Sequence, residues 1–252
     1  MPQLSTILPY IESLLNTPRF KDASLNGVQV GGWDSQIKTV AYAVDAGLSI
    51  IEKAVANEAD LLLVHHGLFW DKPQAITGPL RDKIELLIKN RCTLYASHLP
   101  LDASSEVGNG FELARFLGLS EITSWGEYNG TLIGARATNT GLSLTKITEK
   151  LSTLPGAIKP LILNFGKEKI SSVGIVTGSG SFAISQAARD GLDLLISGEP
   201  KQESYHLARE LKLNIIFAGH YATETVGVAA LAKKVAERFD CKVVFIDEPT
   251  GI

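Results

Sequence analysis

The stretch Tyr95-Ala-Ser-His98-Leu-Pro-Leu-Asp102 decides how this chain is interpreted, because a second stretch, Phe217-Ala-Gly-His220-Tyr-Ala-Thr-Glu224, follows the same pattern. Each leads from an apolar run through a small residue to a histidine with a carboxylate four positions later. A third apolar run, Leu61-Leu-Leu-Val64, ends in His65-His66-Gly67. Open α/β sheets bind ligands at the carboxyl ends of their strands. We therefore predict that these histidines lie at such strand ends.

Strands and helices alternate in the first half of the chain, which is typical of an α/β protein with a mostly parallel sheet. The predicted strands are 39–44, 61–64 and 93–97, and the predicted helices are 48–58, 80–90 and 110–117. The pattern is weaker after residue 119. There we expect strands at 130–137 and 159–164, and a helix at 143–154 with Ser143 as its N-cap.

An internal repeat relates the two halves of the sequence. Thr39–Gly47 aligns without a gap with Ser172–Gly180, and the continued alignment pairs His66 with Glu199. A second block pairs His98 with His220. Self-similarity of this kind indicates two pseudo-repeated α/β lobes with mostly parallel or mixed sheets. We expect a first lobe at 1–119, a candidate inserted subdomain at 120–165 and a second lobe at 166–252, with a ligand site in the cleft between the lobes.

The composition describes an ordinary globular protein. The 252 residues suffice for a substantial core, with 45% hydrophobic and 20% charged residues. A net charge of −3 gives no global attraction to nucleic acid or to an anionic membrane, although a local basic groove would permit nucleic-acid binding. No apolar run approaches the roughly 20 residues of a membrane span. The distant Cys92 and Cys241 fit buried thiols in a reducing compartment, so we expect a soluble, cytoplasmic protein.

Four of the five histidines lie at predicted strand ends, and acids accompany them. Neutral imidazoles and carboxylates are ligands for Zn, Fe, Mn, Co or Ni. If the two lobes face each other, one cleft collects the side chains of His65, His66, His98, Asp102, Glu199, His220 and Glu224. Because these are more donors than one ion needs, the sequence predicts a dinuclear metal site.

Other interpretations of these residues remain open at this stage. Asp102 and Glu224 could be N-caps of the helices that follow them. Glu199 could be a carboxylate in a surface turn. Gly178-Ser-Gly180 is a weak anion-site pattern, since it lacks the spacing of a nucleotide-binding loop. Asn26-Gly27 could be a plain hairpin turn or a close approach of the backbone to a site.

Several of these strings together resemble one family over essentially the whole chain, the Nif-three-like family of dinuclear-metal proteins. Its members are often labelled GTP cyclohydrolase I type 2 homologues. The strings are Asn26-Gly-Val-Gln-Val30, Ala43-Val-Asp-Ala46, Leu63-Val-His-His-Gly-Leu-Phe-Trp70, Ser97-His-Leu-Pro-Leu-Asp102, Ser197-Gly-Glu199 and Ala218-Gly-His-Tyr-Ala-Thr-Glu224.

The resemblance implies a ligand set, a fold and an assembly. The implied metal ligands are His65, His66, Asp102, His220 and Glu224, with Glu224 bridging two divalent ions per subunit. His98 then lies beside the metals as a catalytic residue rather than as a ligand. The resemblance also implies two α/β lobes per subunit and a toroidal homohexamer whose sites face an inner cavity.

Two functions are carried forward from the sequence. The first is a metal-dependent hydrolase in which metal-bound hydroxide attacks a purine nucleotide or related phosphate compound, as the cyclohydrolase label implies, while His98 or Glu199 moves protons. The second is a non-catalytic metal-binding regulatory or interaction protein that associates with DNA or a transcription factor. His and carboxylate ligands suit several first-row ions, so the sequence leaves the metal unassigned.

Overall fold

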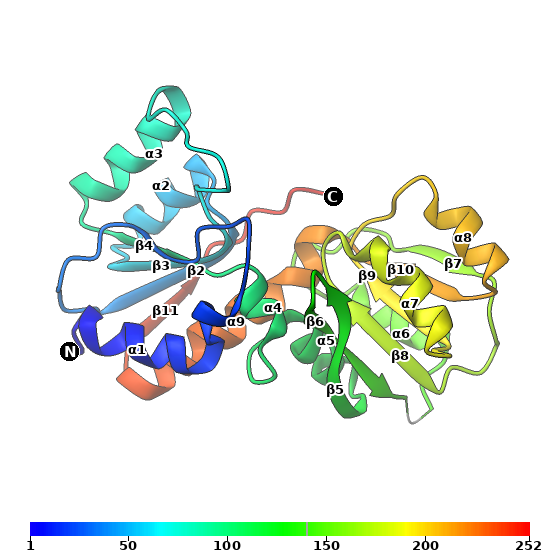
Figure 1. Cartoon of the computed structure of the whole chain (residues 1–252). Helices are drawn as coiled ribbons and strands as arrows, with labels where there is room; N and C mark the ends of the chain where they lie inside the picture. Colours follow the sequence, from blue (N-terminus) through cyan, green and yellow to red (C-terminus); the bar gives the residue numbers. More distant parts are fainter. Residues whose placement is uncertain (140) are drawn as a thin grey trace. The chain divides into compact units, whose positions relative to one another are not determined.

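The computed structural model describes residues 1–139 and 141–252, and its contacts divide the chain into two compact units (Figure 1). Unit 1 comprises Met1–Leu101 and Val228–Glu248, and unit 2 comprises Asp102–Gly227 and Pro249–Ile252. The chain passes from unit 1 into unit 2 within helix α4 (Leu99–Ala103), and it returns within helix α9 (His220–Phe239).

Unit 1 is built on a five-stranded sheet with the order β1-β4-β3-β2-β11. The strands are β1 (Gly27–Val30), β2 (Thr39–Asp45), β3 (Leu61–His66), β4 (Thr93–Ala96) and β11 (Lys242–Phe245). Only β1 is antiparallel to its neighbour; the other pairings are parallel. Every residue of β3 and β4 except the terminal His66 is buried, as expected for strands covered on both faces.

Helices cover the unit 1 sheet, and most of them match the predicted elements. They are α1 (Leu4–Leu15), the 3₁₀ turn η1 (Thr17–Arg19), α2 (Leu48–Ala56) and α3 (Gly78–Lys89). The apolar faces of α2 and α3 join one sheet face in a core cluster that includes Ile51, Leu87, Leu62 and Leu94. The opposite face carries Tyr95, whose hydroxyl donates to Glu12 of α1 at 2.7 Å. The helices are therefore distributed over both faces (Figure 1).

Unit 2 is built on a six-stranded mixed sheet with the order β5-β6-β8-β9-β10-β7. The strands are β5 (Ser120–Tyr128), β6 (Thr131–Thr138), β7 (Leu161–Asn164), β8 (Ser172–Val176), β9 (Leu194–Ser197) and β10 (Asn214–Phe217). The remaining helices are α5 (Asn109–Leu117), α6 (Leu144–Leu151), the 3₁₀ turn η2 (Gly180–Ala183), α7 (Ile184–Arg189) and α8 (Ser204–Glu210). Ser143 caps α6 as predicted, because its side chain accepts from the Lys146 backbone N–H at 3.2 Å.

The predicted repeat is visible in the two sheets. In unit 1 the parallel strands β2, β3 and β4 are followed at the edge by antiparallel β1, and in unit 2 β8, β9 and β10 are followed in the same way by β7. A carboxylate accepts hydrogen bonds from two backbone N–H groups at the start of each repeat. Asp60 accepts from the backbone N–H groups of Lys38 and Thr39 at 2.7 and 3.0 Å. Asp193 accepts from those of Ser171 and Ser172 at 3.0 and 3.2 Å.

The bounds of the two units differ from the lobes that the sequence suggests. The stretch 120–165, expected as a candidate inserted subdomain, contributes β5, β6 and β7 to the unit 2 sheet. Strand β11, which lies within the predicted second lobe, pairs with β2 of unit 1. Both differences arise because the partner of an edge strand is chosen by long-range pairing, which leaves no local signal in the sequence.

Two smaller sequence expectations can be compared with the fold. Cys92 is buried and Cys241 is partly buried, and both are free thiols. Among the described residues, no helix is both long and apolar enough to cross a bilayer.

Candidate metal centre

Unit 1 gathers three imidazoles at the carboxyl ends of two neighbouring parallel strands. His65 and His66 end β3, and His98 lies two residues after the end of β4. The ring centroid of His65 lies 4.6 Å from that of His66 and 5.1 Å from that of His98. One donor atom from each residue lies within 4.8 Å of the others, a spacing that could hold a metal ion. We call these three residues the histidine cluster.

Each imidazole of the histidine cluster has its Nδ1 atom next to a protein acceptor. The Nδ1 of His65 lies 2.9 Å from the Ser97 carbonyl oxygen, and that of His66 lies 2.8 Å from the Asp45 carboxylate. A carbonyl or carboxylate oxygen can only accept, so Nδ1 is the protonated nitrogen and Nε2 carries the lone pair. This arrangement fixes ring orientation and tautomer as the outer contacts of metal-binding histidines do.

The third imidazole, His98, is oriented by Asp22. The Nδ1 of His98 lies 2.9 Å from Asp22 Oδ1. The same carboxylate accepts from the Leu99 backbone N–H and from the Asn26 side chain, both at 2.9 Å. Burial alone would raise the pKa of Asp22, but the hydrogen bond and charge of His98, with the bonds from Asn26 and Ser24, lower it to about 2. The side chain of Asp22 is only 3% exposed, and its low pKa keeps the carboxylate behind the ring charged at neutral pH.

Trp70, which is exposed, lies beside two rings of the histidine cluster. Its ring centroid lies 5.1 Å from that of His98 and 6.2 Å from that of His66. The indole N–H donates to the Gly67 carbonyl at 3.2 Å, which holds the ring in place. Gly67 itself is required by packing, since a Cβ there would stand 2.3 Å from the side-chain amide of Gln29.

Unit 2 gathers one imidazole and two carboxylates, which we call the acid cluster: His220, Glu224 and Glu199. His220 begins α9, so Glu224 lies one turn further on the same face. The Nε2 of His220 lies 3.1 Å from Glu224, and its Nδ1 lies 3.3 Å from Glu199, which follows β9. Burial alone would lower the pKa of His220, but Glu224 and Glu199 together raise it to about 9.

A glycine makes room for the acid cluster. Gly178 follows β8 with a φ of +56°, a conformation that L side chains rarely adopt. A Cβ at this position would stand 2.2 Å from Glu224 Oε1 and 2.9 Å from His220 Nε2. The glycine of the Gly178-Ser-Gly180 string therefore leaves room at the end of β8 for the Glu224 carboxylate and the His220 imidazole.

Asp102, the remaining predicted ligand, is buried in α4 at the start of unit 2. Its Oδ1 accepts from the side-chain amide of Asn109 at 2.8 Å. The Asn109 side chain in turn accepts from the Gly227 backbone N–H at 2.9 Å, so it is fixed at both ends. Asp102 and Glu224 each lie inside a helix, and the helix-cap interpretation of these two acids is therefore wrong.

Within each unit, the donors present fit divalent first-row cations. The histidine cluster offers imidazole nitrogens whose tautomer the protein has already selected, and the acid cluster offers buried carboxylate oxygen. These are the ligand types that Zn, Fe, Mn, Co and Ni accept.

The residues that orient the imidazoles escaped the sequence analysis. Asp22 and Asp45 lie 76 and 21 positions from the histidines they contact. Asp22 stands in a stretch without periodicity, so no local pattern marks it. The repeat does give a signal for Asp45. Its counterpart in the aligned strand is Gly178, and a carboxylate aligned with a glycine indicates a position that has different roles in the two lobes. Asn26, which the sequence places in a turn, also accepts from the His98 backbone N–H at 2.7 Å.

Comparison with known proteins gives consistent relatives over the whole chain. A family model described as Duf34/NIF3 (NGG1p interacting factor 3) matches residues 2–251. A Deinococcus radiodurans protein named GTP cyclohydrolase 1 type 2 homolog is 40% identical over 247 residues, covering 98% of this chain and 93% of that protein. An Archaeoglobus fulgidus protein of the same name is 39% identical over 250 residues, covering 99% of each.

Solved structures agree with these sequence matches. TTHA1606 from Thermus thermophilus superposes with a TM-score of 0.92 at 40% identity, and protein ybgI, described as of unknown function, with a TM-score of 0.90 at 32% identity. Each covers 100% of both chains. The predicted fold class, an α/β protein with two mixed sheets, is confirmed. The chain belongs to the Duf34/NIF3 family.

Proposed function

We propose that this protein is a metal-dependent hydrolase that binds two divalent ions per chain. The observation that carries the proposal is the histidine cluster. In each of its imidazoles, Nδ1 donates a hydrogen bond to a protein acceptor, and Nε2 carries a lone pair that can bind a metal. A protein that needed these histidines only for packing would not need three separate acceptors to select one tautomer. The names of the full-length relatives, GTP cyclohydrolase 1 type 2 homolog, support a hydrolytic reaction.

The proposed ligands come from both units. His65 and His66 supply neutral nitrogens, while Asp102, His220 and Glu224 supply two carboxylates and one further nitrogen. Glu224, which is 4% exposed and contacts the His220 imidazole, would supply carboxylate oxygen to both ions. His220 binds a metal only after losing a proton, and Glu224 and Glu199 stabilise the protonated ring until then.

Two residues are proposed to move protons. His98 stands in the histidine cluster with Asp22 behind its Nδ1, an arrangement that orients Nε2 toward a reacting group and stabilises the ring when it gains a proton. Glu199 contacts His220 and accepts from the Ser179 hydroxyl, so its carboxylate is held at the strand end. When bound, a pair of divalent cations lowers the pKa of coordinated water and stabilises negative charge that develops on the substrate.

The proposed substrate class is a purine nucleotide or a related phosphate compound. The direct test incubates purified protein, loaded separately with Zn, Mn, Fe, Co or Ni, with GTP and other purine nucleotides, and follows ring opening by absorbance and chromatography. We expect turnover with at least one metal and its loss in His98→Ala, with retained metal content. Arg209→Ala on α8 is the matched control. No turnover with any metal contradicts the hydrolase proposal, and metal loss in His98→Ala reassigns His98 as a ligand.

A second function is a non-catalytic interaction protein, which the family description "NGG1p interacting factor 3" favours for at least one relative. For this chain, the test is retention of single-stranded DNA or a protein partner as a function of salt, because contacts with phosphates weaken steeply with ionic strength. Absence of DNA retention at low salt removes the nucleic-acid version. The proposed toroidal homohexamer is tested independently by light scattering of the metal-loaded protein.

A further inference from the structure

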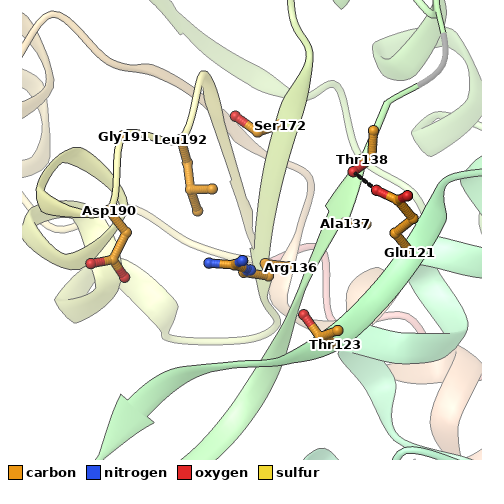
Figure 2. Close-up of a pocket in the computed structure, with 9 residues that line it drawn as sticks. All are labelled: Glu121, Thr123, Arg136, Ala137, Thr138, Ser172, Asp190, Gly191 and Leu192. Atoms are coloured by element: carbon orange, nitrogen blue, oxygen red, sulfur yellow. Dashed lines mark hydrogen bonds between the residues drawn. The ribbon is translucent and has the colours of Figure 1, made fainter.

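Unit 2 carries a pocket that shares no residue with the histidine cluster or the acid cluster. Its volume is about 370 Å³, within the range of small-molecule sites. Figure 2 shows the lining side chains, which come from β5, β6, the start of β8 and the loop between α7 and β9. The lining residues are Glu121, Thr123, Arg136, Ala137, Thr138, Ser172, Asp190, Gly191 and Leu192.

Strand register places Arg136 at the centre of the pocket floor. Arg136 of β6 is paired with Thr123 of β5 on one side and with Gly174 of β8 on the other. Residues directly opposite in an antiparallel pair point to the same face, so Arg136, Thr123 and Gly174 share one face, and the Trp125 and Leu192 side chains cover Gly174. Two positions further along, Thr138 is paired with Ser172. The floor therefore offers one guanidinium and several hydroxyl groups.

Arg136 is exposed, and its guanidinium makes no hydrogen bond and no ion pair with the residues that the structure describes. Two carboxylates, Glu121 and Asp190, line the same pocket. Figure 2 shows the guanidinium between the Asp190 side and the Glu121 side of the pocket. An arginine that served only to neutralise its neighbours would close onto one of them. The charges instead stay apart across open space.

Each carboxylate is held in place by another group. Glu121 has a φ of +51° at an irregularity in the pairing of β5 with β6, and its carboxylate accepts from the Thr138 hydroxyl at 2.7 Å. Bulges of this kind re-aim side chains, and non-glycine residues with positive φ concentrate at functional sites. Asp190 accepts from the Trp125 indole N–H at 2.8 Å. Hydrogen bonds from Arg189 and Trp125, with the charges of Arg189 and Arg136, hold the pKa of Asp190 below its usual range.

We propose that this pocket is a second ligand site that binds a small zwitterion, an α-amino acid. The carboxylate of the ligand binds the fork of Arg136, which matches its planar geometry. The ammonium group faces the Glu121 and Asp190 carboxylates, and Leu192 offers an apolar wall for a small side chain. The binding is independent of the metals, since no lining residue belongs to either cluster.

The two carboxylates in the pocket disfavour the binding of ligands that carry only negative charge. Inorganic phosphate would gain Arg136 and the hydroxyl groups, but it would bring its negative charge next to Glu121 and Asp190. Asp190 is already paired with Arg189 at 3.0 Å, so acetate would leave the Glu121 carboxylate without a cation, and ethylamine would leave Arg136 without an anion. A ligand with both charges matches Arg136 and Glu121 together.

The test is saturation-transfer NMR titration of the full chain with glycine, L-alanine, L-serine and L-threonine, beside acetate, ethylamine and inorganic phosphate. We expect saturable binding of at least one amino acid. Acetate, ethylamine and phosphate should bind about tenfold more weakly or worse, since each lacks one charge-assisted contact. No saturable binding of any of the four amino acids overturns the proposal, and so does equal affinity for acetate or phosphate.

Variants locate the site. Arg136→Ala should weaken amino-acid binding about tenfold or more, and Arg136→Lys should weaken it too, because lysine keeps the charge but loses the fork. Glu121→Gln keeps the hydrogen-bond acceptor for Thr138, so it should weaken amino-acid binding and leave acetate binding equal or stronger. Arg209→Ala should change nothing. Unaltered binding in Arg136→Ala, with a normal circular dichroism spectrum, overturns the assignment. If Arg136→Ala does not fold, Glu121→Gln decides by its opposite effects on the two ligands.

Discussion

The two repeated lobes have one scaffold but different donors at their strand ends. Asp60 and Asp193 occupy matching positions and fasten the same two backbone N–H groups in each lobe. At the opposite end of the strands the match stops. The first lobe presents three imidazoles, while the second presents one imidazole with two carboxylates. The starts of the strands therefore match in the two lobes, and the ends that carry the candidate metal donors differ.

Two aligned positions show how the divergence was achieved. Asp45 in the first lobe accepts from the His66 ring, and its counterpart Gly178 in the second lobe is an empty position beside Glu224. His66 itself is replaced by Glu199 in the alignment. In the first lobe, the Asp45 carboxylate orients an imidazole. In the second lobe, the absence of a side chain at Gly178 leaves room for Glu224 of helix α9. The first lobe is therefore richer in imidazole nitrogen, and the second is richer in carboxylate oxygen.

The largest effect is expected from removing one donor from either lobe. If both lobes bind the same pair of ions, Glu224→Gln and His66→Ala should each lower metal affinity by more than about 100-fold, beyond the loss typical of outer contacts. Competition with a chelator of known affinity measures this. His206→Ala on α8 is the control and should bind metal normally. A strong loss of metal affinity in one variant and none in the other would contradict a shared site, because each lobe would then bind its metal separately.

Gly178→Ala should produce the next largest effect. A Cβ beside Glu224 Oε1 and His220 Nε2, on a left-handed backbone, should displace the acid cluster and lower the free energy of unfolding by about 2 kcal/mol. Metal affinity should fall as well. Thermal melts and chelator competition measure the two effects.

Gly130→Ala is the matched control for Gly178→Ala. Its φ is +81°, but no atom lies within 4 Å of the added Cβ, so it carries the backbone strain without the contact. Equal metal affinity in the two variants would mean that Gly178 serves the turn alone.

Asp22→Asn tests the orienting carboxylate of the first lobe through pH. The pKa of Asp22 is about 2 in the folded chain, below the ordinary 3.8, so its contribution to stability is present above about pH 4 and is lost as pH falls toward 2. That contribution is about 2 kcal/mol at neutral pH. Urea unfolding should show a gap of that size between wild type and Asp22→Asn at pH 7, which closes toward pH 2. Asp71→Asn, on an exposed loop, should match wild type throughout, and a constant gap for Asp22→Asn would contradict the assignment.

Asp45→Asn should have the smallest effect. Asparagine still offers an oxygen to the His66 Nδ1–H but carries no charge, so the tautomer is kept and the ring becomes a weaker donor. We expect metal affinity to fall about tenfold. Isothermal titration with Zn measures it, and unchanged affinity would show that Asp45 serves only the geometry of β2.

The sequence was most informative where local patterns determine structure. The apolar runs 61–64 and 194–196 specify strands buried on both faces, and these carry the histidines and Glu199 to the strand ends. Strand β5 gave little signal because most of its residues are exposed and Glu121 interrupts its pairing. Asp22 and the placement of β11 depend on partners far along the chain, so no local pattern predicts them.

Anomalous scattering from crystals of metal-loaded protein, recorded at the absorption edge of the bound metal, tests the central claim most directly. We expect two peaks per chain, about 3.5–4 Å apart. Nitrogens of His65 and His66 and oxygens of Asp102 and Glu224 should lie within bonding distance of them. A single peak bound by residues of one lobe alone, or no peak at these residues, would contradict it.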